Sequence, residues 1–222
     1  MNVILKRSTD LFICSDAIRE CWQSQDKSDN GGPKDKALIE RVGNKFKHAS
    51  TLEHLVYTFS ISGISRALLQ ELARHRMASP SVKSTRYTLG ELAKESDILF
   101  NSSCGGIDMD IDWEIAERYL VLTSNADLNK MNAVTLANVQ AFKKDGISND
   151  ILKYCLPEAY KTSLTWTVNA RSLQNFINLR TNKAALWEIQ TLANKVYEAL
   201  PKDHKYLFEH FNQFENLENA EA

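Results

Sequence analysis

Residues 74–87 read Arg-His-Arg-Met-Ala-Ser-Pro-Ser-Val-Lys-Ser-Thr-Arg-Tyr, a strongly basic stretch in an almost neutral chain. Its arginine and lysine side chains are interleaved with serine and threonine hydroxyls. Arginine binds phosphate and carboxylate oxygens two at a time through its planar guanidinium group. This segment therefore indicates a binding site for a multiply charged anion.

Pro80 lies in the middle of the basic segment. Proline fixes its own φ and disfavours helical backbone at the preceding Ser79, so we expect a shaped loop over residues 77–84. Free backbone amides in such a loop, together with the hydroxyls of Ser81 and Ser84, are suited to phosphate oxygens. The plainer alternative is a solvated basic turn.

An apolar stripe precedes the basic segment. Ile64, Leu68 and Leu72 have helical spacing, and Arg76 would be the next residue on the same face. The pattern predicts a helix that leads into the loop, with Arg76 directed toward the core and in need of an anionic partner.

A second informative stretch, residues 166–180, reads Trp-Thr-Val-Asn-Ala-Arg-Ser-Leu-Gln-Asn-Phe-Ile-Asn-Leu-Arg. We expect a strand followed by a helix over 170–180, with Leu173, Phe176 and Arg180 on one stripe. The opposite face carries an arginine and two asparagines, namely Arg171, Asn175 and Asn178. Asparagine is a poor residue for a helix interior, so this face suggests specific hydrogen bonding to a ligand. A solvated polar face, and a snorkelling or salt-bridged Arg180, are the alternatives.

The whole chain has 222 residues, 43% hydrophobic residues and a formal net charge of −1. We expect one domain over residues 1–222, without a global field that favours nucleic acid. Cys14, Cys21, Cys104 and Cys155 have no metal-binding or redox spacing, and neither a signal peptide nor a membrane span is evident. We therefore predict a cytoplasmic protein with free thiols, no metal site and no membrane partner.

The remaining patterns predict a helix-rich α+β fold with a small sheet. The expected strands cover 2–6, 55–61 (ended by Gly63) and 161–168. The expected helices cover 16–23 (capped by Ser15), 34–47, 113–144, a short helix after Ser148, 170–180, 184–200 and a final segment with Leu207, Phe211 and Phe214. Residues 29–33 and 101–112 are expected to be loops.

The basic segment resembles a motif of the flavin-dependent thymidylate synthases, the ThyX family. The family pattern is Arg-His-Arg-x-x-Ser-x-Asn-x-x-Ser-x-Arg-Tyr, and the chain departs from it at Ser81, where the family usually has Asn. Residues 166–180, Trp187 to Gln190 and, more weakly, Glu53-His54 are also similar to the family. The resemblance spans roughly residues 52–190.

The resemblance implies conversion of dUMP to dTMP by a homotetramer with a ThyX-like fold, a small, mostly antiparallel sheet and active sites shared between subunits. FAD would be the cofactor, with NADPH and 5,10-methylenetetrahydrofolate as co-substrates. Arg180 would be catalytic, stabilising negative charge on the uracil ring. Ser84 would serve binding rather than act as a nucleophile, because the sequence shows no base committed to it.

The resemblance also implies two sets of binding residues. The FAD contacts would be His54, Val56, Arg74, His75, Arg76, Val82, Asn169, Ala170, Arg171 and Asn175. The dUMP contacts would be Glu71, Arg74, Val82, Lys83, Ser84, Thr85, Arg86, Lys153 and Arg180.

Besides Ser81, the chain has Val82 where many members have Glu or Gln, and Lys153 where Arg is frequent. Each departure removes a hydrogen-bonding option, which predicts altered nucleotide affinity more than lost chemistry. Two alternatives follow: a weakly active family member, or a phosphate- or RNA-binding module without redox chemistry.

Overall fold

The computed structural model describes residues 1–101 and 109–213. The chain forms two compact units: residues 1–61, 71–81 and 164–222 make up unit 1, and residues 62–70 and 82–163 make up unit 2. The prediction of one domain over the full length stays a prediction. The predicted α+β class is confirmed, because the chain is helix-rich with a small antiparallel sheet.

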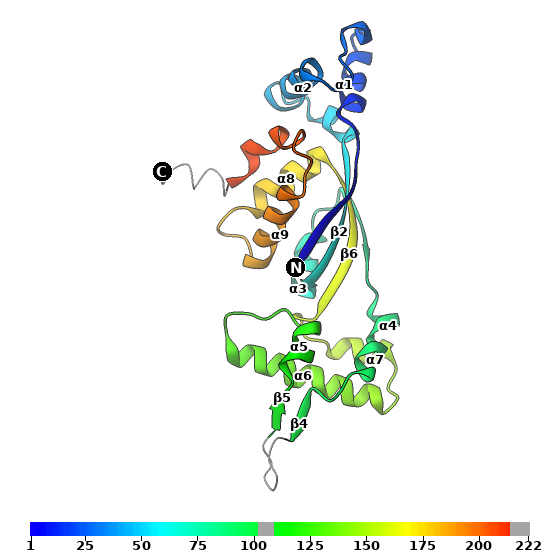
Figure 1. Cartoon of the computed structure of the whole chain (residues 1–222), viewed down its shortest axis with the longest axis vertical. Helices are drawn as coiled ribbons and strands as arrows, with labels where there is room; N and C mark the ends of the chain where they lie inside the picture. The colour runs from blue at the N-terminus through cyan, green and yellow to red at the C-terminus, as the bar shows by residue number, and fades with distance from the viewer. Residues whose placement is uncertain (102–108, 214–222) are drawn as a thin grey trace. The chain divides into compact units, whose positions relative to one another are not determined.

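The main sheet has the strand order β1-β2-β6-β3 (Figure 1). Its strands are β1 (Asn2–Ser8), β2 (Val56–Ser65), β6 (Lys161–Asn169) and β3 (Ala78–Val82). The predicted strands at 2–6, 55–61 and 161–168 are confirmed. The prediction that Gly63 ends the second strand is wrong, because Gly63 adopts a φ of +70° that lets β2 continue to Ser65.

The predicted loop over residues 77–84 is also wrong, since Ala78–Val82 form β3. Pro80 is accommodated because β3 is an edge strand, where one side of the backbone needs no partner. The amide of Lys83 donates to the carbonyl of Ser163 (2.8 Å), so it is not free to bind phosphate.

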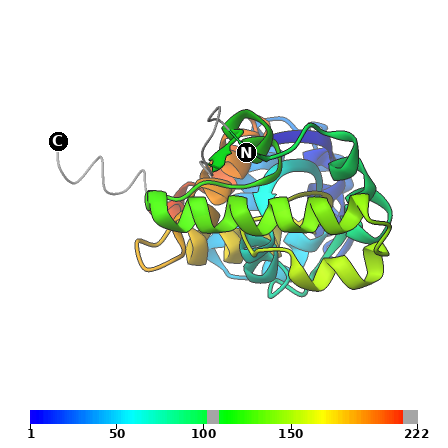
Figure 2. The ribbon, with the colours of Figure 1, turned by 90° about the horizontal axis from the view of Figure 1, so that it is seen from below.

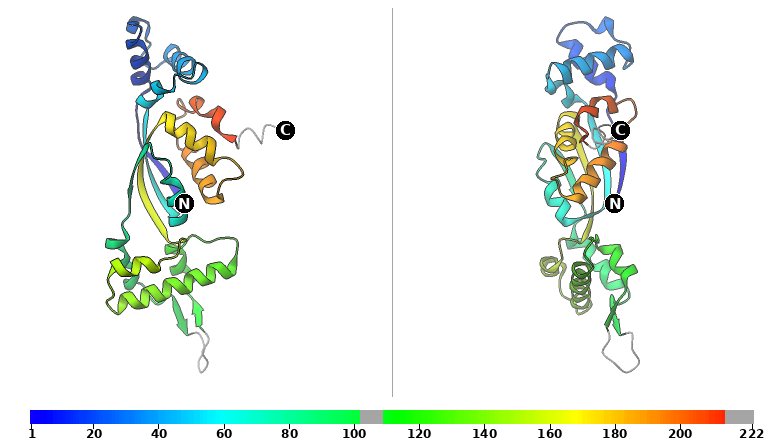
Figure 3. Two further views of the ribbon diagram at one scale, coloured as in Figure 1. Left: turned by 180° about the vertical axis from the view of Figure 1, so that it is seen from behind. Right: turned by 90° about the vertical axis from the view of Figure 1, so that its left-hand side faces the viewer.

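The helices of unit 1 lie at the N-terminal and C-terminal ends of the chain. They are α1 (Leu11–Glu20), η1 (Gln25–Lys27), α2 (Pro33–Ile39), η2 (Glu40–Lys45), η3 (Ala49–His54), α8 (Ala170–Arg180), α9 (Trp187–Glu198), η6 (Lys205–Leu207) and η7 (Glu209–Phe211). Both views of Figure 3 show α8 and α9 packed side by side. The expected helix at the end of the chain is two short 3₁₀ turns instead, and Phe214 lies outside the described residues.

Helix α1 begins five residues earlier than predicted. Asp10, not Ser15, is its N-cap: the Asp10 carboxylate accepts from the amide of Phe12 at 2.8 Å. Ser15 is buried inside the helix and donates to the carbonyl of Phe12. The earlier start puts Leu11, Cys14 and Ile18 on one buried stripe.

A row of buried rings forms the centre of unit 1. Phe59 lies between Tyr57 and Trp166 with centroid distances of 6.4 and 6.2 Å, and Trp166 meets Phe176 of α8 edge-on at 5.1 Å. All four side chains are almost completely buried. This row fixes α8 against β2 and β6.

Unit 2 is mainly helical. It contains α4 (Thr85–Thr88), η4 (Leu89–Lys94), α5 (Trp113–Tyr119), α6 (Ala126–Lys144), α7 (Asn149–Leu152), η5 (Lys153–Cys155) and the antiparallel strands β4 (Leu99–Asn101) and β5 (Met109–Ile111); α3 (Arg66–Leu72) is assigned partly to each unit. In Figure 2 the long helix α6 crosses the view from side to side. The buried side chain of Gln140 in α6 accepts from the amide of Ile98 and donates to the carbonyls of Leu92 and Ser96. One amide group thereby attaches the segment after η4 to α6.

Two predictions for unit 2 need correction. The single helix over 113–144 is two helices, because Asn125 caps a new helix by accepting from the amide of Leu128 at 3.0 Å. The expected loop over 101–112 contains the last residue of β4 and the whole of β5, while residues 102–108 are outside the described part. Of the four cysteines, Cys14, Cys21 and Cys155 are free and Cys104 is not described. No helix among the described residues has the length and apolar character needed to cross a membrane.

A buried ion pair holds α1 to α2 in unit 1. The Arg19 guanidinium donates twice to one oxygen of Asp35 (3.0 and 2.6 Å), and the other oxygen accepts from Ser28 and from the amide of Gly31. Burial raises the pKa of Asp35, but these hydrogen bonds outweigh it and lower the pKa to about 2. The carboxylate is thus fully compensated in the folded state.

We expect Asp35→Ala to lower the free energy of unfolding by about 3–5 kcal/mol, because a buried Arg19 would lose its partner. Because the folded-state pKa is below the unfolded value of about 3.9, the wild type should lose this stabilisation as pH falls from about 4 to about 2. Chemical denaturation at pH 7 and at pH 3 measures both effects. Asp203→Ala, which removes the exposed partner of Lys36, is the matched control and should change little. An Asp35 variant as stable as the wild type would contradict the assignment.

Candidate functional site

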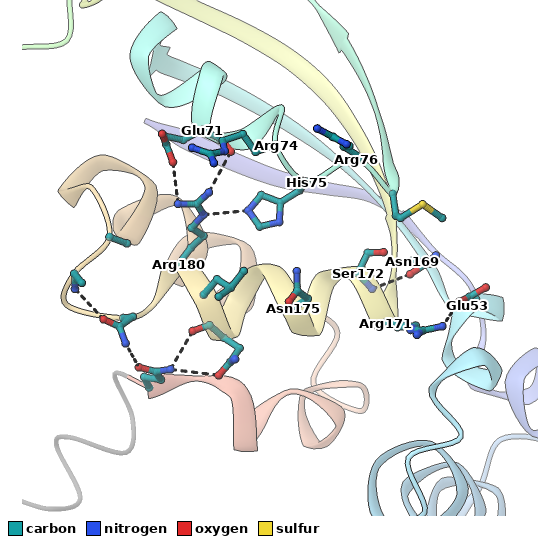
Figure 4. Close-up of a pocket in the computed structure, with 17 residues that line it drawn as sticks. Glu53, Glu71, Arg74, His75, Arg76, Asn169, Arg171, Ser172, Asn175 and Arg180 are labelled. Carbon is teal, nitrogen blue, oxygen red and sulfur yellow. Dashed lines mark hydrogen bonds and ion pairs between the residues drawn. The ribbon is translucent and has the colours of Figure 1, made fainter.

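Unit 1 contains a pocket of about 1170 Å³, which we call the large pocket (Figure 4). Its walls come from residues 71–77, from α8 and the loop after it, and from Glu53 and Gln213. Its volume exceeds the range of about 300–1,000 Å³ typical of sites for one small molecule. The pocket has room for a large cofactor or for more than one ligand.

One wall of the large pocket is the polar face of α8. Arg171, Asn175 and Asn178 line it, as the sequence predicts, while Leu173 and Phe176 are buried on the other side. Arg180 also lines the pocket although it continues the apolar stripe. The two sets of polar residues on this helix therefore serve one cavity.

Arg180 is held in place by two partners (Figure 4). Its Nη1 donates to the carboxylate of Glu71 at 2.9 Å and its Nε to Nε2 of His75 at 3.0 Å, while Nη2 approaches the carbonyl of Glu71 at 3.4 Å. The Arg180 side chain is 17% exposed. Arg180 is therefore salt-bridged, which is one of the alternatives that the sequence left open. Its side chain nevertheless lines the large pocket.

His75 is neutral in this arrangement. Burial, the larger cause, and the Arg180 cation together lower the pKa of His75 to about 4, although Glu71 acts in the opposite direction. Because arginine can only donate, Nε2 of His75 must accept, which places the proton on Nδ1. The ring also meets Phe176 edge-on at 5.0 Å, so His75 connects the pocket to the buried ring row.

Arg74 and Arg76 contrast with the other arginines of the large pocket. Both are exposed, and neither has an ion-pair partner among the described residues. The prediction that Arg76 faces the core is wrong, because α3 ends at Leu72 and the helical spacing does not continue. The lining has four arginines and two glutamates, so with neutral His75 it carries a formal surplus of two positive charges.

The N-terminus of α8 forms the other end of the pocket. Asn169 caps the helix by accepting from the amide of Ser172 at 2.9 Å, which leaves its amide NH₂ as the group that can bind a ligand. Arg171 pairs with Glu53 at 2.8 Å. Ala170 is fully buried and its amide donates to the carbonyl of Leu55, so it does not line the pocket.

The second half of the basic segment belongs to unit 2, apart from Ser81. Lys83 pairs with Glu91 at 3.1 Å, and Arg86 pairs with Asp150 at 2.6 Å. A phosphate bound there would compete with these carboxylates. No base among the described residues hydrogen-bonds to the hydroxyl of Ser84, and its role in binding rather than as a nucleophile stays a prediction.

The remaining predicted contacts do not line the large pocket. His54 is exposed at the end of η3, Val56 begins β2, Val82 ends β3, Thr85 is buried at the start of α4, and Lys153 is half-buried in η5. Their ligand roles stay predictions. No cluster of histidine, cysteine and acidic residues within the described ranges could hold a metal ion.

Sequence reasoning assigned no ligand role to several lining residues. Glu53 is the partner of Arg171, and Gln213 accepts from Asn182 and donates to the carbonyl of Asn178 at 3.0 Å. Gln213 is far from α8 in the sequence, so no spacing could have revealed it. Glu53 precedes His54 in the sequence and belongs to the same short family motif, so its carboxylate could have been recognised as a potential partner for an arginine.

Around the large pocket, a helix packed on a sheet presents several arginines and amides, an arrangement suited to phosphate-bearing ligands. The model of the family described as "Thymidylate synthase complementing protein" matches residues 3–204. The flavin-dependent thymidylate synthase of Wolinella succinogenes is 60% identical over 208 residues, which cover 94% of this chain and 97% of that protein. The flavin-dependent thymidylate synthase of Campylobacter jejuni is 58% identical over 210 residues, which cover 95% of this chain and 97% of that protein.

Solved structures agree with this comparison. The flavin-dependent thymidylate synthase ThyX from Helicobacter pylori, crystallised in complex with FAD and dUMP, superposes with a TM-score of 0.87 at 49% identity. The match covers 96% of this chain and 100% of that chain. The chain therefore belongs to the family of flavin-dependent thymidylate synthases, and the resemblance drawn from the two motifs is confirmed.

We expect the imidazole of His75 to titrate with a midpoint near pH 4. An NMR titration of the histidine ring protons measures this. Arg180→Gln should raise the midpoint, because a neighbouring cation is removed, but leave it below 6.5, because burial remains. A wild-type midpoint near 6.5 would show that His75 is not buried against Arg180.

Proposed function

We propose that this protein binds FAD and dUMP and converts dUMP to dTMP, with 5,10-methylenetetrahydrofolate as the carbon donor and NADPH as the reductant of the flavin. The observation that carries the proposal is the surplus of two positive charges on the large pocket, concentrated on Arg74 and Arg76. A dinucleotide has a diphosphate of matching charge. The volume of about 1170 Å³ also suits a cofactor of that size.

Arg74 and Arg76 would hold the diphosphate, because their guanidinium groups have no competing carboxylate among the described residues. Nδ1–H of His75, the amide of Asn169 and the side chains of Arg171 and Asn175 would bind the remaining polar atoms of FAD. The contacts of His54, Val56, Val82 and Ala170 with FAD are part of the same proposal and rest on the family resemblance.

Reduced flavin, when bound, supplies the hydride for this reaction. The chain's own contribution to catalysis would be the guanidinium of Arg180. Three of its five N–H groups donate to Glu71 and His75. One N–H on Nη1 and one on Nη2 are then left to donate to a ligand. These two donors would face the uracil ring and stabilise negative charge there without any change in the protonation of Arg180.

The dUMP contacts would further include Glu71, Arg74, residues 82–86 and Lys153. Backbone amides and hydroxyls of Val82, Ser84 and Thr85 would bind the nucleotide, while Lys83 and Arg86 would exchange carboxylates for phosphate. We also propose a homotetramer in which neighbouring subunits share each active site, as the family resemblance implies.

Because the chain belongs to the family, the alternative that remains is a family member with weak activity. The departures from the family pattern at Val82 and Lys153 support this alternative. Val82 offers only its backbone to a nucleotide, and Lys153 lacks the bidentate geometry of arginine. A dUMP-dependent NADPH oxidation assay with FAD and 5,10-methylenetetrahydrofolate tests both possibilities. dTMP formation that sustains repeated turnover supports the proposal, whereas flavin and dUMP binding with only slow dTMP formation would establish the weakly active alternative.

We expect Arg180→Ala to lower kcat about 100- to 1,000-fold, because one charged donor to the developing anion is lost. The variant should stay folded and keep its flavin absorbance. Arg180→Lys is the control that keeps the charge but loses the fixed donor geometry, and its activity should lie in between. Wild-type turnover by Arg180→Ala would remove this residue from the mechanism.

We expect Arg76→Ala chiefly to weaken FAD binding, because this exposed arginine has no ion-pair partner among the described residues that would give it a structural role. Flavin absorbance after gel filtration, followed by titration with FAD, measures the loss. Removing one charge-assisted hydrogen bond should weaken binding by about tenfold or more. If the affinity for FAD is unchanged, Arg76 does not contact the diphosphate.

A further inference from the structure

A second cavity of unit 1, about 490 Å³ in volume, lies along α1, α2 and η2, and we call it the basic cavity. It is lined by Arg19, Lys34, Ala37, Leu38, Arg41, Lys45 and Phe46. None of these residues lines the large pocket. The basic cavity is therefore a separate site, and neither the motifs nor the proposed function accounts for it.

All polar residues that line the basic cavity are basic. The lining has four basic residues and no acidic one. Asp35 neutralises Arg19, but Lys34, Arg41 and Lys45 are exposed and have no ion-pair partner among the described residues. Arg41 and Lys45 are four residues apart in one helical segment, a spacing at which like charges destabilise a helix.

The neighbouring carboxylates are already engaged elsewhere. Asp29 accepts from the amides of Lys34 and Asp35, and Glu40 accepts from Asn44. Neither lines the cavity. The three charges of Lys34, Arg41 and Lys45 thus have no ion-pair partner among the described residues of unit 1.

The backbone carries an independent signal at the same place. Residues Glu40–Lys45 form a π-helix, in which the amide of Phe46 donates to the carbonyl of Arg41. π-Helical turns are rare and occur frequently at functional sites. This turn ends at Phe46, whose ring is 62% exposed at the cavity, and such exposure of an aromatic ring is otherwise unfavourable.

The three charged residues are also spread along one helical run. Lys34 is at the start of α2 and Lys45 at the end of η2, with Arg41 between them. Eleven residues of helix correspond to roughly 16 Å, so a single small anion cannot contact all three. A ligand that uses the whole lining must itself be elongated.

We propose that the basic cavity binds an elongated organic anion that carries several phosphate or carboxylate groups. Lys34, Arg41 and Lys45 bind the successive anionic groups, the buried Arg19–Asp35 pair forms a rigid wall, and Phe46 packs on an apolar part of the ligand. The inference does not depend on the proposed function, because the two cavities share no residue.

Calorimetric titration of the full chain, in buffer that contains FAD and dUMP, tests the proposal. The probes are inorganic tripolyphosphate and a tetraglutamate peptide, which separate a phosphate ligand from a carboxylate ligand. We expect one equivalent of at least one probe to bind per chain, with an affinity that falls as salt is added. The double variant Arg41→Gln/Lys45→Gln should bind about tenfold or more weakly, because two charge-assisted hydrogen bonds are lost.

Two matched variants give the test its specificity. Lys36→Gln removes a charge from α2 that does not line the basic cavity and should bind the probes like the wild type. Arg76→Ala alters the large pocket and should also leave the affinity for the probes unchanged. An unchanged thermal midpoint in Arg41→Gln/Lys45→Gln confirms that this variant is folded.

Three results would overturn the proposal. These are no saturable binding of either probe to the wild type, equal affinity in Arg41→Gln/Lys45→Gln, and loss of probe binding in Arg76→Ala, which would put the anion in the large pocket.

Discussion

The packing of α8 against the sheet is the constraint on which the site depends. Trp166 and Phe59 contribute rings from β6 and β2, and Phe176 from α8 meets Trp166 edge-on. His75 then packs edge-on against Phe176 and accepts from Arg180. Because every ring in this series is positioned by its neighbour, a change in the core of unit 1 would move the guanidinium at the pocket surface. The apolar interior thereby determines where a charged group is presented.

Four arginines of unit 1 illustrate two different electrostatic environments. Arg19 and Arg180 are largely buried, have carboxylate partners and are held in one geometry. Arg74 and Arg76 are exposed and lack such partners among the described residues. A preorganised cation suits stabilisation of a charge that develops during a reaction, while an unpaired cation suits binding of a ligand that arrives already charged. The large pocket contains both types.

The sequence predicted the elements with strong periodicity and the residues that carry motifs. The helix over 170–180 was found with its bounds, because the apolar stripe is clear; that Asn169 caps it is seen only in the structure. The loop around Pro80 and the burial of Arg76 were wrong, because neither the edge position of β3 nor the end of α3 is visible in local spacing. The partners Glu53 and Gln213 come from distant segments, so only the fold brings them to the pocket.

The two outer strands of the sheet also bear on how copies of the chain can associate. β3 contains Pro80, which has no N–H to offer a further strand, and β1 carries the charged residues Lys6 and Arg7 near its end. Both features discourage backbone pairing with another molecule. The sheet is therefore protected against open-ended growth into fibres, and side-chain surfaces rather than strand edges are left for any contact between copies of the chain.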